Sequence, residues 1–136
     1  MTLVLERAHI NLIARNSLNE YPREACGILI GRMKQDIKVV KRVFKTHNIL
    51  ESASRYAIDP KEQLEAFKLA DDLSMDVVGF YHSHPYWRPY PSATDHSLAF
   101  YEGLSYAIYS LVTKSLASYI WNGKSFDREE VHIIDD

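Results

Sequence analysis

The chain has 136 residues, of which 46% are hydrophobic and 25% charged, a balance that predicts one globular domain over 1–136. The formal net charge of −2 gives no electrostatic basis for binding nucleic acid or an anionic membrane surface, and no segment reaches the roughly 18 continuous apolar residues of a membrane span. A single cysteine excludes an intrachain disulfide and a multi-thiolate metal site, and without a signal-peptide pattern at the N-terminus we expect a cytoplasmic protein.

The first third of the chain predicts a helix followed by a hairpin of two strands. Apolar residues recur at a roughly helical period over residues 3–20, and Tyr21-Pro22 ends the run. Residues 24–31 are apolar and bounded by glycine, which predicts a strand. Residues 36–46 alternate β-branched side chains with lysine and arginine, which favours a second strand with one face in solvent.

The middle of the chain predicts a loop and then a second helix. Residues 47–54 are polar, and residues 55–58 form a brief extended piece. Asp59 can cap a helix whose first position is Pro60, and the apolar pattern that follows ends near Ser74.

The last part of the chain predicts one buried strand, a short helix and an antiparallel meander. The elements are a strand from Asp76 to Tyr81, a helix over 92–101 ended by Gly103, and strands at 106–113, 116–121 and about 130–134, the last after an Asn122-Gly123 turn. The predicted order is helix, hairpin, helix, strand, helix and antiparallel meander. This mixed order indicates an α/β protein, a single-domain α-β-α sandwich with a mixed sheet.

Two histidines at the end of the Asp76 strand indicate a metal site. His82 and His84 are two residues apart, so their side chains point to the same side of the strand. Asp95 follows after a proline-rich loop, in the first turn of the next helix. Two imidazoles and one carboxylate suit zinc, and catalytic zinc sites use three protein ligands and leave a fourth position for water. Alone, the histidines could be a surface pair, and Ser92-x-x-Asp95 could be a helix capping box.

A hydrolytic zinc site also needs a general base and a donor for the developing oxyanion. Ser92 is placed to donate a hydroxyl hydrogen bond near the metal. Several glutamates could be the base by residue type, and Glu24 stands out because it opens an apolar strand, where an unpaired carboxylate is costly.

The complete pattern of these residues resembles the JAMM (MPN+) metalloprotease motif, without a gap or a substitution. The resemblance extends over about residues 5–122 and is carried by segments 21–27 (YPREACG), 55–60 (RYAIDP), 79–85 (GFYHSHP) and 90–95 (YPSATD). It implies one Zn²⁺ held by His82, His84 and Asp95. It also implies Glu24 as the acid/base, Ser92 as support for the oxyanion, and a cytidine-deaminase-like fold.

The same resemblance implies a substrate class. Small prokaryotic members resemble enzymes that hydrolyse the amide bond after the C-terminal diglycine of a ubiquitin-like or sulfur-carrier protein. Three alternatives stay open: release of a single amino acid such as cysteine from a carrier, a non-catalytic MPN scaffold, and a RadC-like DNA-repair-associated protein, which the charge and length disfavour. A homodimer is compatible with the sequence, although no apolar stripe demands it.

The loop after the histidines departs from the family pattern. Relatives often carry small residues where this chain has Tyr86-Trp87-Arg88. Tyr86 and Trp87 are therefore candidate substrate-binding residues, since aromatic side chains are enriched at recognition surfaces. Alternatively, they only pack the loop.

Overall fold

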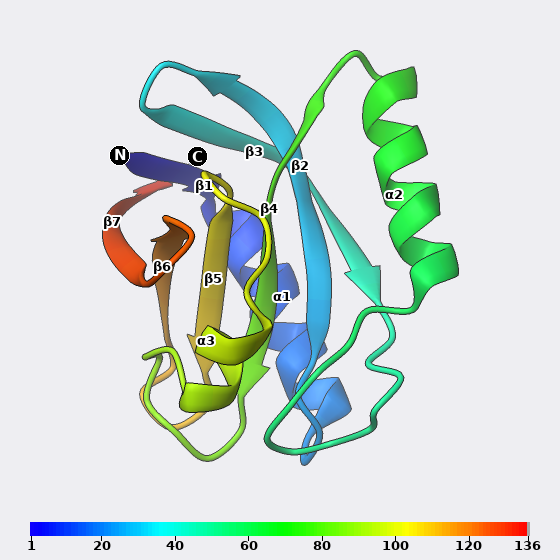
Figure 1. The fold of residues 1–136 in the computed structure, drawn as a ribbon, viewed down its shortest axis with the longest axis vertical. Helices are drawn as coiled ribbons and strands as arrows, with labels where there is room; N and C mark the ends of the chain where they lie inside the picture. Colours follow the sequence, from blue (N-terminus) through cyan, green and yellow to red (C-terminus); the bar gives the residue numbers. More distant parts are fainter. Residues whose placement is uncertain (136) are drawn as a thin grey trace.

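The computed structural model describes residues 1–135, in which helices flank a seven-stranded mixed sheet (Figure 1). The elements are β1 (Thr2–Glu6), α1 (Arg7–Glu20), β2 (Cys26–Lys34), β3 (Ile37–Thr46), α2 (Pro60–Asp72), β4 (Asp76–His84), α3 (Ala93–Leu98), β5 (Ser105–Ser110), β6 (Ser115–Trp121) and β7 (Phe126–Ile134). Within residues 1–135, none of the helices combines the length and the apolar character needed to cross a membrane.

The strands lie in the order β1-β3-β2-β4-β5-β6-β7, and β7 returns to β1, so the sheet closes on itself. The β2–β3, β2–β4, β5–β6 and β6–β7 pairs are antiparallel, whereas β4–β5 and both pairs of β1 are parallel. The prediction of a mixed sheet in an α/β fold is confirmed.

The prediction of a helix from residue 3 was wrong at its start, because residues 2–6 form β1. Leu3 and Leu5 are fully buried while their neighbours are half-buried, which is the period of two that marks a strand. Five residues are too few to distinguish the period of a helix from that of a strand. The segment becomes a strand because it pairs with β3 on one side and β7 on the other. Several other bounds also differ: β2 extends to Lys34, β4 extends to His84, α3 ends at Leu98, β5 ends at Ser110 and β7 begins at Phe126.

Helices cover both faces of the central strands, as the predicted sandwich requires. Leu29 of β2 and Tyr81 of β4 belong to one core cluster, which includes apolar residues of α1. Ile28 of β2 and Phe80 of β4 face the other way, into a cluster that includes apolar residues of α2. Burial on both sides explains why these strands read as continuous apolar runs.

The predicted solvent face of β3 was wrong at its first residues. Ile37 is 50% exposed, while Lys38 is 1% exposed. The ammonium of Lys38 lies 3.4 Å from a carboxylate oxygen of Glu129, which is also buried. That carboxylate accepts further hydrogen bonds from Ser105 Oγ at 2.6 Å and Ser118 Oγ at 2.7 Å. Residues of β3, β5, β6 and β7 thus form a buried polar network in the closed sheet.

Candidate metal centre

The candidate site lies at the carboxyl end of β4, between its two neighbouring strands. His82 pairs with Cys26 of β2 on one side, and His84 pairs with Ser110 of β5 on the other. Because β2 runs antiparallel to β4, its first residues approach the last residues of β4. This register brings Glu24, two residues before Cys26, to the same end of the sheet as the histidines.

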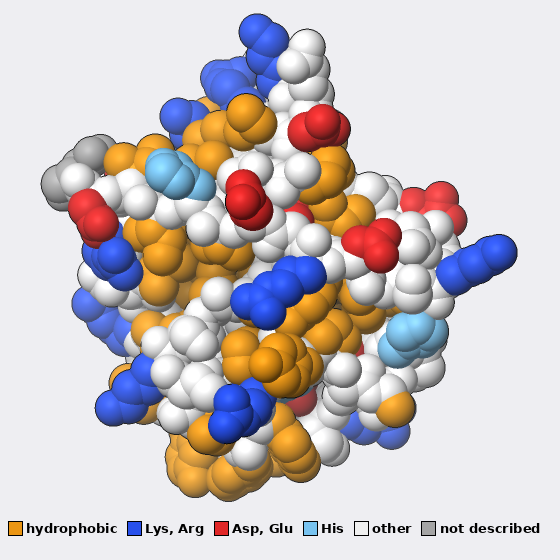
Figure 2. Space-filling view, turned by 90° about the vertical axis from the view of Figure 1, so that its left-hand side faces the viewer, with side chains coloured by type: hydrophobic (Ala, Val, Ile, Leu, Met, Phe, Trp, Pro, Cys, Tyr) orange, Lys and Arg blue, Asp and Glu red, His pale blue; other side chains and the backbone are white. Residues whose placement is uncertain are grey.

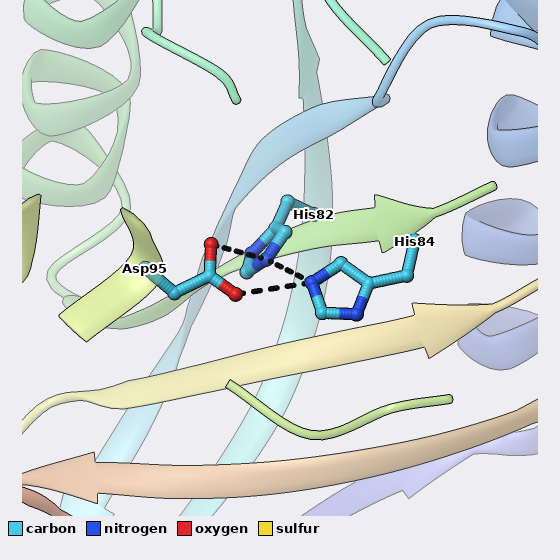
Figure 3. A group of neighbouring side chains, drawn as sticks. All are labelled: His82, His84 and Asp95. Atoms are coloured by element: carbon cyan, nitrogen blue, oxygen red, sulfur yellow. Dashed lines mark hydrogen bonds and ion pairs between the residues drawn. The ribbon is translucent and has the colours of Figure 1, made fainter. Parts of the chain in front are cut away.

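Three buried side chains converge at this end, as predicted (Figure 3). His84 Nε2 lies 3.0 Å from Asp95 Oδ2, and His82 Nε2 lies 3.2 Å from Asp95 Oδ1. The two Nε2 atoms are 3.3 Å apart. Ligands about 2.0–2.1 Å from a tetrahedral zinc are about 3.3 Å from one another, so these separations fit the ion.

Hydrogen bonds fix the orientation of two of the three side chains. His84 Nδ1 donates to the carbonyl oxygen of Arg88 at 2.9 Å, and this leaves a lone pair on Nε2. Asp95 Oδ2 accepts from the Ser92 amide at 2.9 Å, and the Asp95 amide donates to Ser92 Oγ at 3.0 Å. The segment is therefore a capping box that begins α3 and also aims a carboxylate at the histidines.

His82 is held differently. Its Nδ1 is buried and has no hydrogen-bond partner among residues 1–135. Its ring stacks on that of Tyr56, with the centroids 4.5 Å apart and 22° between the planes. Sequence reasoning did not assign Tyr56 to the site. It lies in the short extended piece at 55–58, within the segment 55–60 that resembles the family, and an isolated bridge between Asn48 and Ile58 holds this piece in place.

The surroundings of His82 and Asp95 favour the protonation states that a metal requires. Burial lowers the pKa of His82, although the charge of Asp95 partly opposes the shift, and burial therefore favours the neutral imidazole. Burial alone would raise the pKa of Asp95, but His82, with additional hydrogen bonds from His84 and Ser92, holds it well below its usual range. Neutral imidazole and ionised carboxylate are the forms that bind zinc. These residues therefore fit the ion.

Glu24 is 1% exposed, and its Oε1 has no hydrogen-bond partner in the described chain. Burial, and to a lesser degree the charge of Asp95, raises the pKa of Glu24 to about 9. Its backbone is fixed, since its amide donates to Ser52 O at 2.8 Å and its carbonyl accepts from Asn48 Nδ2 at 3.0 Å. An unpartnered buried carboxyl with a shifted pKa is typical of an acid or base in a functional site.

Two clefts lie near the centre. One is lined by the ligand His84, and the other contains none of the three ligands but is lined by Tyr56, which stacks on His82. The Glu24 cleft has a volume of about 570 Å³, and the residues that matter here are Glu24, His84, Trp87, Arg88 and Ser92. The aromatic cleft, of about 310 Å³, is lined among others by Leu50, Tyr56, Phe100, Tyr101 and Tyr106. Glu24 and Ser92 thus face one cleft, and Tyr56 faces the other.

The loop after the histidines exposes large aromatic side chains at the lower end of the molecule. Tyr86 is 49% exposed and Trp87 53% exposed. Figure 2 shows hydrophobic side chains gathered at this end, where Figure 1 places the β4–α3 loop. Trp87 lines the Glu24 cleft, whereas Tyr86 packs edge-on against Tyr21 at the end of α1, with ring centroids 5.6 Å apart. The two residues therefore differ in what they contact.

Comparison with known proteins finds similar sequences and a similar fold. Residues 6–128 match a family described as prokaryotic homologs of the JAB domain. A desampylase of Haloferax volcanii is 35% identical over 106 residues, which are 77% of this chain and 74% of that protein. A CysO-cysteine peptidase of Mycobacterium tuberculosis is 33% identical over 97 residues, or 71% of this chain and 65% of that protein. The solution structure of a Desulfitobacterium hafniense protein, 33% identical, superposes with a TM-score of 0.91 and covers 98% of this chain and 94% of that one.

Proposed function

The chain belongs to the family of prokaryotic JAB-domain proteins, and from this premise we propose that it is a zinc metallopeptidase acting on diglycine tails. Its reaction is hydrolysis of the amide bond after the C-terminal diglycine of a ubiquitin-like or sulfur-carrier protein. The observation that carries the proposal is the buried cluster of His82, His84 and Asp95 with Glu24 at the same end of the sheet. The names of the relatives, a desampylase and a CysO-cysteine peptidase, support the substrate class.

His82, His84 and Asp95 hold the zinc ion in this proposal. When bound, zinc supplies Lewis acidity that polarises the scissile carbonyl and makes a water molecule acidic. The protein contributes a dry, pre-shaped set of ligands, because all three side chains are buried before any substrate arrives.

Glu24 moves the protons of the reaction. Its free carboxylate oxygen takes a proton from the attacking water, whose oxygen forms a bond with the carbonyl carbon of the terminal glycine. The carbon–nitrogen bond then breaks, its electron pair stays on nitrogen, and Glu24 delivers the proton to that nitrogen. The products are a glycine carboxylate and a free amine. In the protein without metal, burial raises the pKa of Glu24 to about 9, so its carboxyl is mostly protonated at pH 7. The positive charge of a bound zinc ion would lower this pKa and favour the carboxylate that accepts the proton of water.

Ser92 supports the carbonyl oxygen as it gains negative charge. Its Oγ accepts a hydrogen bond from the Asp95 amide at 3.0 Å, which fixes the oxygen and leaves its hydrogen available to donate. A donor held in place before the reaction stabilises the developing charge without reorganising.

A narrower activity, release of one amino acid from a carrier, is the second candidate, and the similarity to the CysO-cysteine peptidase favours it. A non-catalytic scaffold is disfavoured because every residue of the motif is present and the ligand atoms converge.

Incubation with a panel of ubiquitin-like and sulfur-carrier fusions, with and without chelator, tests the proposal. We expect chelator-sensitive cleavage directly after the second glycine, and mass spectrometry of the released fragment separates a protein leaving group from a single amino acid. No zinc-dependent cleavage of any fusion would reject a peptidase of this class.

A further inference from the structure

The position of Glu24 determines which cleft holds the leaving group, given the proposed function. Glu24 must reach the leaving nitrogen to protonate it, and a proton donor works within hydrogen-bond distance. Glu24 lines the Glu24 cleft and is absent from the lining of the aromatic cleft. The leaving amine therefore lies in the Glu24 cleft.

Arg88 is the basic residue that lines this cleft. Its side chain is exposed, and its guanidinium makes no ion pair with any carboxylate in residues 1–135. The other cleft residues near it are aromatic or neutral, apart from Glu24, whose raised pKa reflects burial. An unpaired guanidinium in a recognition cleft is available for a ligand carboxylate.

The loop that carries Arg88 is held rigidly by its backbone. The carbonyl oxygen of Arg88 accepts a hydrogen bond from Nδ1 of His84 at 2.9 Å, so the Arg88 backbone contacts a metal ligand directly. The carbonyls on either side are also held, that of Trp87 by Ser110 Oγ at 2.6 Å and that of Pro89 by the Tyr119 hydroxyl at 2.8 Å. Three consecutive anchored carbonyls fix the starting point of the Arg88 side chain relative to the metal centre, and such preorganisation reduces the entropic cost of binding.

We propose that Arg88 is a specificity-determining residue that binds a carboxylate of the leaving group. The planar guanidinium matches a carboxylate with two parallel hydrogen bonds. A single amino acid released from a carrier has its α-carboxylate next to the scissile nitrogen. A lysine side chain of a modified protein has only methylene groups there. The structure thus favours release of one amino acid, or another carboxylate-bearing amine, over cleavage of an isopeptide.

The test compares two forms of one carrier protein that the enzyme cleaves, extended after Gly-Gly by a single cysteine. One form ends in the free carboxylate and the other in the carboxamide. The wild-type enzyme with zinc should show a kcat/KM about tenfold higher for the free acid, mainly through KM, because a hydrogen-bonded charge is lost with the amide. Raising the ionic strength should narrow the difference.

Arg88→Gln should lower kcat/KM for the free-acid substrate about tenfold and leave kcat/KM for the carboxamide substrate unchanged. For the free acid, Arg88→Lys should have a kcat/KM between those of the wild type and Arg88→Gln. The substitution leaves the carbonyl that holds His84, so zinc content and circular dichroism should match the wild type. Arg55→Gln is a matched control, since Arg55 is an exposed arginine on the aromatic cleft, and it should not change the acid-to-amide ratio.

Two results would overturn the inference. Equal turnover of acid and amide by the wild type, unchanged in Arg88→Gln, rejects the role of Arg88 while leaving the peptidase intact. If the zinc-loaded wild type cleaves no carrier, in either form or as an isopeptide conjugate, the proposed function fails and the role of Arg88 fails with it.

Discussion

The aromatic ring of Tyr56 stacks face to face on the imidazole of His82, with ring centroids 4.5 Å apart. The other histidine, His84, is oriented by a hydrogen bond from its Nδ1 to the carbonyl oxygen of Arg88. Nδ1 of His82 has no such bond within residues 1–135. Ring stacking therefore restrains the rotation of His82 together with the contact between its Nε2 and Asp95. Outer contacts of metal ligands contribute to affinity because they hold the ligand atoms in the binding geometry.

Replacing Tyr56 should therefore weaken zinc binding without changing the ligand set. We expect Tyr56→Leu to lower zinc affinity about tenfold or more, while Tyr56→Phe, which keeps the stacked ring, stays close to the wild type. Competition with a chromogenic zinc chelator measures both. Equal affinity in Tyr56→Leu and the wild type would show that stacking does not position His82.

Substitution of Glu24 should separate chemistry from folding. Glu24→Gln keeps nearly the same shape in a buried site and cannot accept the proton of water, so we expect turnover to fall about 10²–10⁴-fold. Zinc content and thermal stability should be preserved, because Glu24 is not among the three converging ligands. Glu65→Gln, at an exposed position on α2, is the control. Activity within a few-fold of the wild type would mean that another group is the base.

Removal of the carboxylate ligand should abolish tight zinc binding. Asp95 is the only carboxylate of the cluster, so Asp95→Ala leaves two imidazoles and an incomplete site. After dialysis the variant should retain much less than the single zinc per chain expected for the wild type. Added zinc should raise the melting temperature of the wild type but not of the variant, since a ligand stabilises only the state that binds it. Ser92→Ala should retain the metal, because the Ser92 backbone amide that orients Asp95 remains.

The metal ligands could be predicted from the sequence because their spacing is local. His82 and His84 share a strand face by the period of two, and Asp95 begins the next helix. Tyr56 and Arg88 could not be predicted in the same way. The contact of Tyr56 with His82 depends on how the loop between β3 and α2 folds back over β4. Arg88 contacts His84 through its backbone carbonyl, which every residue type has, so the sequence does not indicate this contact.

The fold shows the same division between local and long-range information. The central strands and α2 follow from apolar runs and a capping sequence, and they were predicted correctly in kind. β1 was missed because its five residues fit two periods, and the buried position of Lys38 depends on Glu129, 91 residues away in the sequence. Periodicity identifies a face but does not show which buried partner a charged residue will meet.

Cys26 should make folding stability depend on pH above about 8.5. Burial raises the pKa of its thiol to about 12, whereas an unfolded cysteine titrates near pH 8.5. Below that pH both states are protonated, and the thiol adds no pH dependence. Between about pH 8.5 and 10 the unfolded state alone releases the proton, so the unfolding free energy should fall by up to about 1.4 kcal/mol per pH unit. Urea unfolding of the wild type and Cys26→Ala across this range measures the effect, and parallel slopes in the two proteins would contradict it.

The buried pair of Lys38 and Glu129 should be destabilising to break and much less costly to replace as a whole. Removing one partner leaves the other charge buried and unpaired, so Glu129→Leu and Lys38→Met alone should each lower the unfolding free energy by about 3–5 kcal/mol. The double variant removes both charges, although the hydroxyls of Ser105 and Ser118 lose their acceptor. We therefore expect its loss to be well below the sum of the single losses, because the coupling between residues in contact is not additive. Denaturant unfolding of the wild type, the two single variants and the double variant gives the four free energies of this double-mutant cycle. If the loss of unfolding free energy in the double variant equals the sum of the single losses, the two charges are stabilised separately, for example by water. The ion pair would then not stabilise the packing of β3 against β7.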